Sequence, residues 1–498
     1  MVDAAIAPPT RPAPADPRDR AAARSDLRIA LPPVVLVVAA SVVGALRRPV
    51  WLDEAYTVAA THDVGMAFAA ARGSMALYYV FAAAWGQVVD SLLWLRAPSV
   101  LAGAAAVGIF TVAVRRQAGE AVARWAGLGV AVSYLVVRYA QEARSYALVA
   151  LLVVGAWAAL DRGVEDPAGQ TPWRLHLLCC ALLPLAHGMA ALQLPMQALA
   201  LLVGGVRGPA LRRGLLDIGA GLVSTVAVLA MGANGSGDWL PPLTPDRAWA
   251  LLSTFIVPFP ALGAAVLLTT LVASWALARR VARAGRGLDR FRLVVPLAWG
   301  PLSLALLLAV STVRPSQLSR YALPSIFGLV LVLALATTAV DRRRAQAADA
   351  TLPIASLAMV VVLGLGGLAA TTDAGEPWPE AARVVAEGAR PGDVIAFPTA
   401  DARLPFDAAW RELDAPTAPG VVGVPTELGS VRREVEPAPV DVLASEVGTA
   451  PRLWVVVQPY MHVTNPDLVA RPEVRAAYRS EQTWDLGDGI TVELLVLR

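Results

Sequence analysis

The chain has 498 residues, of which 56% are hydrophobic and 16% charged, and its mean hydropathy is +0.56. Soluble domains are closer to half apolar, with about a quarter of their residues charged, so this composition excludes an ordinary soluble protein and indicates a polytopic α-helical membrane protein. The formal net charge is +3, and the basic residues are all arginines. These arginines lie between apolar runs rather than on a soluble basic face, which argues against nucleic acid as a partner.

The first 30 residues are rich in proline and arginine and contain no apolar stretch. They predict a disordered cytoplasmic tail (1–30) and no cleavable signal peptide. A membrane region (31–371) follows, in which Gly44, Gly103 and Gly127 predict close helix packing. Its apolar runs lie near residues 31–47, 75–94, 97–114, 122–137, 145–160, 175–187, 189–206, 214–232, 249–278, 292–312, 319–340 and 352–371.

The arginines predict the topology, because positive charge flanks the cytoplasmic ends of membrane helices. If the N-terminal tail is inside, the first helix carries Asp53 and Glu54 to the outer side. The run at 75–94 contains several tyrosines and tryptophans, which favours a helix that lies in the interface of the first outer loop instead of spanning. All later arginine clusters then fall inside. We therefore predict a multi-pass plasma-membrane protein with about eleven spanning helices and an extracytoplasmic C-terminus.

After residue 371 the composition changes, and residues 372–498 alternate short apolar segments with proline, glycine and acidic residues. Segments 393–397 and 453–457 are typical of buried strands, and segments 379–388 and 467–478 of helices. This pattern predicts a small extracytoplasmic α/β domain. It contains neither a glycine-rich phosphate loop nor a metal-type cluster of His and Cys, so we assign it no chemistry.

Short motifs on the predicted outer side carry a resemblance to a known family. In chain order they are WLDEA (51–55), LYY (77–79), LRAPS (95–99), YAQEARSYAL (139–148), AHG (186–188) and SRYALP (319–324). Together they resemble GT-C-fold glycosyltransferases of the protein mannosyltransferase-like kind, which use polyprenyl-phosphate sugars. The resemblance covers residues 31–371 and implies the GT-C fold for them.

The resemblance also implies an inverting enzyme that moves a sugar from a polyprenyl-phosphate lipid to an envelope glycan, lipid or protein acceptor on the outer face. Asp53 matches the first-loop carboxylate that acts as the base, and Glu54 beside it is assigned a supporting catalytic role. An attacking hydroxyl needs such a base, and guanidinium groups match the departing phosphate. No metal or cofactor is predicted, because arginines supply the charge. The predicted donor-binding residues are Arg96, Arg144, Tyr146, His187, Arg320 and Tyr321.

The sugar and the functional class stay open. Gly73, Ser74, Met75 and Ala76 stand where many relatives have His-Pro-Pro or Lys-Pro. The arginine-only content is typical of a GC-rich, actinobacterial-type genome, in which the expected donors are mannose or arabinose on a decaprenyl phosphate. A transporter or lipid flippase, or an inactive scaffold of envelope glycan assembly, are the alternatives. If Asp53, Arg144 and Arg320 lie together on one side, the enzyme is favoured; charges at the midplane favour transport, and scattered charges favour a scaffold.

Overall fold

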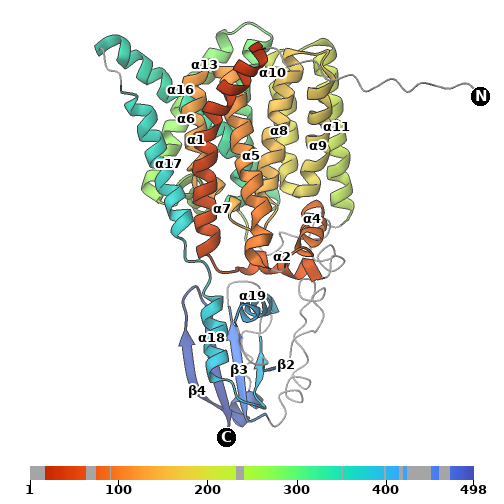
Figure 1. Ribbon diagram of the computed structural model, residues 1–498, viewed down its shortest axis with the longest axis vertical. Helices are drawn as coiled ribbons and strands as arrows, with labels where there is room; N and C mark the ends of the chain where they lie inside the picture. Colours follow the sequence, from red (N-terminus) through yellow and green to blue (C-terminus); the bar gives the residue numbers. More distant parts are fainter. Residues whose placement is uncertain are drawn as a thin grey trace, which may run out of the picture.

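The protein consists of a helical bundle followed by a small sheet with its own helices (Figure 1). The computed structural model describes residues 17–62, 75–89, 91–231, 240–348, 352–397, 400–413, 419–422, 450–458 and 472–498. The bundle begins with α1(Pro17–Arg47), α2(Leu52–His62), α4(Ala76–Gly86), α5(Leu92–Ala118), α6(Glu120–Ala131), α7(Tyr134–Ala140), α8(Tyr146–Glu165) and α9(Gln170–Ala186). It continues with η1(Gly188–Leu192), α10(Gln193–Gly204), α11(Gly208–Ala230), α12(Pro245–Thr254), α13(Pro260–Arg283), α14(Leu288–Leu297), η3(Ala298–Leu302), α15(Ser303–Val313), η4(Ser319–Ala322), α16(Leu323–Ala348) and α17(Ile354–Thr372).

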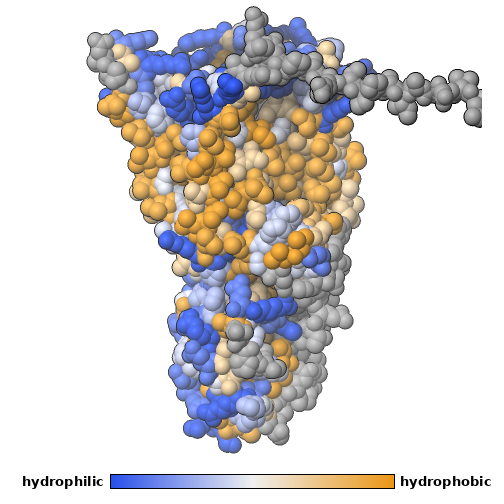
Figure 2. Space-filling view, viewed as in Figure 1, coloured by the Kyte–Doolittle hydropathy of each residue, from blue (hydrophilic) through white to orange (hydrophobic). Residues whose placement is uncertain are grey.

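Eight helices of the described residues are long and apolar enough to cross a membrane, or nine if the bent pair α6–α7 is one span. The expected number of eleven spanning helices is reached only when the shorter helices α9 and α10 are added. Helix α9 packs beside α8 and α11, and α10 packs beside α11 and α14. Figure 2 shows apolar side chains around the middle of the bundle and polar ones at its two ends. Helix α4 has 11 residues, about 16 Å at 1.5 Å per residue, and is too short to span, as predicted.

The N-terminal segment differs from the prediction. Helix α1 begins at Pro17, so residues 17–30 are helical rather than disordered, and residues 1–16 lie outside the described part. Within this additional helical segment, Asp26 pairs with Arg115 and Arg116 at the end of α5. These ion pairs join the N-terminal part of α1 to the end of α5, and the two helices pack as antiparallel neighbours (Figure 1).

Two of the glycines expected to allow close helix packing, Gly44 and Gly103, lie where neighbouring segments approach closely. A Cβ at Gly44 would collide with Oε1 of Gln141, and one at Gly103 would lie 2.8 Å from the Cβ of Ala140. Gln141 in turn donates to the carbonyl oxygen of Ala370 in α17 at 2.8 Å. The small residues therefore let α1 and α5 approach the segment at 140–141, which opens one of the sequence motifs.

The C-terminal residues form a five-stranded sheet in the order β2-β1-β3-β5-β4. Strands β1 and β3 confirm the two predicted strands, and α18 confirms the helix expected at 379–388. Of the segment 467–478, only α21 and the start of β4 lie within the described residues. Strands β2, β1 and β3 are parallel, whereas β5 and β4 add antiparallel pairs. The elements are α18(Trp378–Gly388), β1(Val394–Ala396), α19(Ala400–Arg411), β2(Gly420–Val422), β3(Arg452–Val457), α21(Pro472–Ala477), β4(Tyr478–Asp485) and β5(Thr491–Leu497).

The sheet region and the bundle share a hydrophobic core at their junction. Val50, just before α2, and Ala55, in α2, are buried in one cluster with Trp378 of α18 and Phe406 of α19. Figure 1 shows α2 across this end of the bundle, with α19 next to it. Helix α2 thus lies between the membrane helices and the sheet region.

Candidate active site

The site is built around the first turn of α2, which contains Asp53 and Glu54. The first backbone N–H groups of a helix have no partner within the helix, and the helix dipole makes this end positive. Acidic residues are therefore favourable here, and the first turn of α2 contains two of them. Although adjacent, the two carboxylates have different surroundings.

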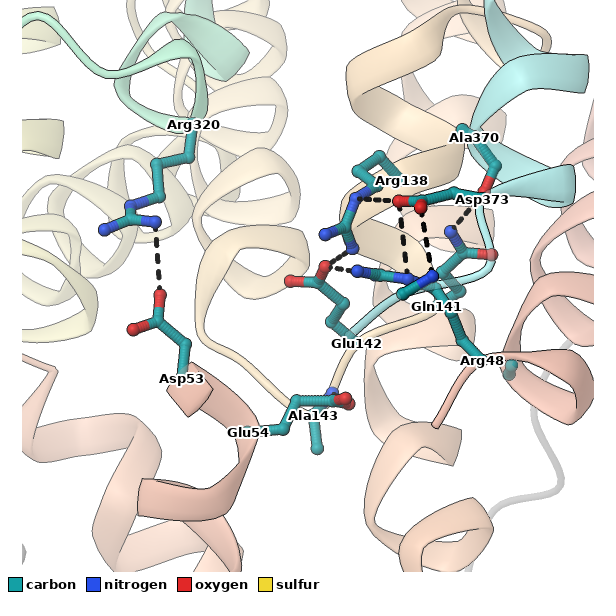
Figure 3. Close-up of polar contacts among 12 residues, drawn as sticks. Arg48, Asp53, Glu54, Arg138, Gln141, Glu142, Ala143, Arg320, Ala370 and Asp373 are labelled. Carbon is teal, nitrogen blue, oxygen red and sulfur yellow. Dashed lines mark hydrogen bonds and ion pairs between the residues drawn. The ribbon is translucent and has the colours of Figure 1, made fainter. Parts of the chain in front are cut away.

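Asp53 lies between two arginines from distant parts of the chain. Its Oδ2 is 3.3 Å from Nη1 of Arg320 in η4 and 3.8 Å from Nη2 of Arg144. Figure 3 shows the Asp53 carboxylate and the Arg320 guanidinium group facing each other. Two positive charges thus converge on one carboxylate, which leaves the trio with a net positive charge.

Arg144 is held rigidly by the neighbouring backbone and side chains. Its Nη1 donates to the carbonyl oxygen of Asp53 and to the hydroxyl oxygen of Tyr79, both at 2.8 Å. The Nε groups of Arg144 and Arg320 are buried and, within the described residues, make no hydrogen bond. Buried guanidinium N–H groups without a partner are costly, and they offer donors for an anionic ligand.

Aromatic rings form one side of this cluster. The ring of Tyr146 lies 4.9 Å from that of Tyr139 and 5.5 Å from that of His187, and the ring of Tyr321 lies 5.0 Å from His187. Tyr321 also lies next to Arg320, whose guanidinium carbon is 5.9 Å from the ring centre. The short turns around η1 and η4 bring His187 and Tyr321 together, although they are far apart in the sequence.

His187 is neutral in this environment. Burial lowers the pKa of His187 to about 3, and the positive charges of Arg144 and Arg320 add to the effect. Its Nδ1 accepts a hydrogen bond from the backbone N–H of Met189 at 3.2 Å. The proton of the neutral ring is consequently on Nε2, which makes this atom a hydrogen-bond donor.

Glu54 and Arg96 are separate from this cluster and form a buried pair. Nε and Nη2 of Arg96 donate to the two oxygens of Glu54 at 2.8 and 2.6 Å. The remaining N–H groups of Arg96 donate to the carbonyl oxygens of Ala45, Arg48 and Pro49. All five donors of Arg96 are thus used within the protein, so the expected role of Arg96 in phosphate binding is not supported by its geometry.

The Glu54 side chain is bound only by protein groups in the described contacts. Besides the two bonds from Arg96, its Oε1 accepts from the backbone N–H of Ala143 at 2.8 Å. This bond ties the first turn of α2 to the segment that ends in Arg144. The pair Glu54–Arg96 therefore anchors the site, and the side chain of Glu54 is occupied by protein donors.

A second charged network was not predicted from the sequence. Glu142 accepts a hydrogen bond from Arg48 at 2.7 Å and pairs with Arg138 (Figure 3). Both arginines also lie 3.6 Å from a carboxylate oxygen of Asp373. Their guanidinium carbons lie 5.9 and 5.3 Å from the ring of Trp51. Two features of the sequence could have indicated this network: the acidic Glu142 within the motif YAQEARSYAL, and the position of Arg138 near the end of a helix.

The motifs therefore meet at the end of the bundle next to the sheet region. Asp53, Arg144, Tyr146, His187 and the η4 residues lie together, as expected for one site, whereas Glu54 and Arg96 support it from the side. Among the described residues, no group of three or more His, Cys, Asp or Glu side chains has the geometry to hold a metal ion. The positive charges of this site are those of arginine.

No protein-family model and no curated protein sequence matches the chain. Solved structures do match it. ArnT from Cupriavidus metallidurans in the apo state has a TM-score of 0.61 and 13% identity, covering 95% of this chain and 98% of that one. The structure of the same protein bound to undecaprenyl phosphate has a TM-score of 0.60 and 14% identity, and the match covers 95% of this chain and 97% of that one.

The oligosaccharyltransferase of Archaeoglobus fulgidus, in complex with Zn and sulfate, has a TM-score of 0.52 and 13% identity. The match covers 85% of this chain and 68% of that one. Both matched proteins are glycosyltransferases with the GT-C fold. The similarity extends over the bundle and the sheet region, and the chain accordingly has the GT-C fold that its sequence motifs predicted.

Proposed function

We propose that the protein is a membrane glycosyltransferase that uses a polyprenyl-phosphate sugar as donor. The observation that carries this proposal is the contact of Asp53 with both Arg144 and Arg320, since it combines a base with two phosphate-binding groups. The match to a structure of ArnT with undecaprenyl phosphate supports a lipid-linked donor. The gathering of these charges at one end of the bundle favours a transferase over a transport path or a scaffold.

In the proposed reaction, a hydroxyl oxygen of the acceptor attacks the anomeric carbon of the donor sugar. A new C–O bond forms as the bond between the anomeric carbon and the phosphate oxygen breaks, with inversion at that carbon. The hydroxyl proton goes to the Asp53 carboxylate, and the electron pair of the broken bond stays on the phosphate. The phosphate thus gains negative charge, which preorganised cations stabilise.

Binding of the donor prepares the base in this scheme. Arg320 faces the Asp53 carboxylate at 3.3 Å, and a carboxylate paired with a cation is a weaker base. A bound phosphate competes for Arg320 and for the unused Nε groups of both arginines. The carboxylate is then less neutralised, so that it accepts a proton only when the donor is in place.

The aromatic side chains of the cluster are proposed to bind the sugar of the donor. Tyr146 and Tyr321 flank His187, and the Nε2–H of neutral His187 is available as a donor to a sugar hydroxyl or phosphate oxygen. We propose a hexose or pentose such as mannose or arabinose as the donor sugar. The acceptor is proposed to be an envelope glycan, lipid or protein on the outer face of the cell membrane, with the N-terminus in the cytoplasm.

The test is a transfer assay with purified protein, radiolabelled polyprenyl-phosphate sugars and crude envelope acceptors. Asp53→Asn is expected to abolish transfer without changing the unfolding midpoint by more than a few degrees. Asp246→Asn is the matched control, because Asp246 is also in the first turn of a short helix but is exposed. Full transfer by Asp53→Asn would remove Asp53 as the base, and no transfer from any donor by the wild type would contradict the proposed activity.

A further inference from the structure

The N-terminus of α2 is held by a carboxylate from the other end of the chain. Oε2 of Glu376, which lies between α17 and α18, accepts a hydrogen bond from the backbone N–H of Leu52 at 3.1 Å. Leu52 is the first residue of α2, and its N–H is one of those that the helix itself leaves unpaired. Glu376 thus acts as a helix cap from 324 positions away. Its negative charge at the positive end of the helix dipole adds to the interaction.

The Glu376 carboxylate is itself fixed by the region that follows it. The indole Nε1 of Trp378 donates to the same Oε2 at 2.7 Å. Trp378 is fully buried in the core that includes Val50 and Ala55 of the α2 segment. The orientation of the carboxylate is consequently set by a rigid aromatic ring packed against the helix that the carboxylate caps.

Asp53 follows Leu52 directly, so the position of the cap sets the position of the proposed base. From the side of the bundle, the same turn is held by Arg144, which donates to the carbonyl oxygen of Asp53. From the side of the sheet region, it is held by Glu376. The backbone of the proposed base is therefore fixed between two groups that belong to different parts of the fold.

We infer that Glu376 is a positioning residue that holds Asp53 in place through the N-terminus of α2, and that the C-terminal region thereby controls the catalytic step. This inference rests on the proposed function, in which Asp53 is the base. Its physical basis is that catalysis is sensitive to small displacements of a reacting group, of the order of 10²-fold for about 1 Å. The donor-binding arginines contact this turn through Asp53 but belong to other segments of the chain, so the KM for the donor is expected to change less than kcat.

The inference predicts a specific pattern for variants of Glu376. Glu376→Ala removes the cap and is expected to lower kcat by about 10- to 100-fold, with the KM for the donor within about two-fold. Glu376→Gln is expected to retain most of kcat, because both donors converge on one oxygen, which an amide carbonyl can replace. Glu380→Ala is the matched control, since Glu380 is an exposed acid of α18 that pairs only with Arg383 in the described contacts.

A second measurement, hydrogen exchange, does not depend on transferase activity. Hydrogen exchange of the backbone amides at residues 52–56, measured in the full-length protein in detergent, is expected to be at least ten-fold faster in Glu376→Ala than in the wild type. Glu376→Gln and Glu380→Ala are expected to match the wild type. If Glu376→Ala does not fold, Glu376→Asp takes its place, because its shorter side chain withdraws the carboxylate from Leu52.

The two readouts separate the possible failures. Equal exchange and equal kcat in Glu376→Ala and Glu380→Ala would overturn the inference, as would a loss of kcat in Glu376→Ala without faster exchange. A rise in donor KM with unchanged kcat would also overturn it, since positioning acts on the catalytic step. A wild type without any transferase activity would contradict the proposed function alone, and the exchange rates would still decide whether Glu376 holds α2.

Discussion

At the scale of single residues, the chemistry depends on which charges remain available to a ligand. Arg144 and Arg320 each have a buried Nε without a hydrogen-bond partner among the described residues. Arg96 is as deeply buried as Arg144, but all its donors are used by Glu54 and by backbone carbonyls. Of these three arginines, Arg144 and Arg320 therefore keep a donor for an incoming phosphate, whereas Arg96 would have to give up bonds within the protein.

Arg320→Gln tests this distinction. We expect kcat/KM for the polyprenyl-phosphate donor to fall by about 10²-fold, because one preorganised cation is removed from the departing phosphate. The measurement is the initial rate as a function of donor concentration. Arg247→Gln is the control, since Arg247 is an exposed arginine of α12, and it should leave the rate unchanged. An Arg320→Gln enzyme with at least half of the wild-type kcat/KM would contradict the assignment.

His187 gives a prediction about pH. Burial, assisted by Arg144 and Arg320, lowers the pKa of His187 to about 3, whereas in the unfolded chain it is about 6.5. Between these values the unfolded chain binds a proton that the folded protein does not, so stability falls as the pH falls. From pH 6.5 to pH 5 the loss amounts to about 1.6 kcal/mol.

His187→Gln removes this titration. Its unfolding midpoint in detergent should therefore drop less between pH 7 and pH 5 than that of the wild type. Equal drops in the two proteins would show that His187 is not held neutral by its surroundings. Because His187 stays neutral across the physiological range, the pH dependence of transfer above pH 5 is expected to be the same in the variant.

At the scale of elements, α2 is a short helix that long-range contacts hold in place. Its first turn is linked to α5 through Glu54 and Arg96, to the segment before α8 through Ala143, and to the sheet region through Glu376. An isolated helix of 11 residues is marginal in water, so these contacts rather than intrinsic propensity fix its position. The position of Asp53, the proposed base, therefore depends on the elements that hold the first turn of α2.

Arg96→Lys is expected to destabilise the protein by about 2 kcal/mol or more. A lysine has three donors and no fork geometry, so it leaves buried carbonyl and carboxylate oxygens unpaired. The unfolding midpoint in detergent measures this effect. Arg124→Lys is the control, because Arg124 pairs with Glu120 on the surface, where such a change is expected to stay within about 0.5 kcal/mol. A stability of Arg96→Lys equal to that of this control would refute the structural role.

At the scale of the whole molecule, the two ends of the bundle differ in composition. One end carries the ion pairs of Arg115 and Arg116 with Asp26 and of Arg292 with Asp161, together with the other arginine clusters. The opposite end carries the proposed active site and the sheet region (Figure 1). Since positive charge is retained in the cytoplasm, we expect the sheet and the site to face outward.

This orientation is tested by cysteine labelling in a variant without Cys179 and Cys180. Glu481→Cys, in exposed strand β4, should react with a membrane-impermeant maleimide in intact cells. Glu120→Cys, exposed at the arginine-rich end, should react only after permeabilisation. The reverse pattern would invert the proposed topology and move the acceptor to the cytoplasmic side.

The sequence by itself determined the class of protein and much of its architecture. Hydropathy is a local property, and it was sufficient to predict the membrane helices, the short helix near residues 76–86 and the strands at 394–396 and 452–457. The order of the motifs was sufficient to predict the GT-C fold. It also pointed to Asp53, Arg144 and Arg320, which the structure brings together.

Only the tertiary structure decided which of these charges a substrate can use. Arg96 and Arg320 look equivalent in sequence, since each is an arginine at the end of an apolar run. Three carbonyls and the Glu54 carboxylate occupy Arg96, whereas Arg320 faces Asp53 and keeps an unused Nε. The cap from Glu376 to Leu52 joins residues 324 positions apart. A buried hydrogen bond depends on which distant segment supplies its partner, and that is a property of packing rather than of local composition.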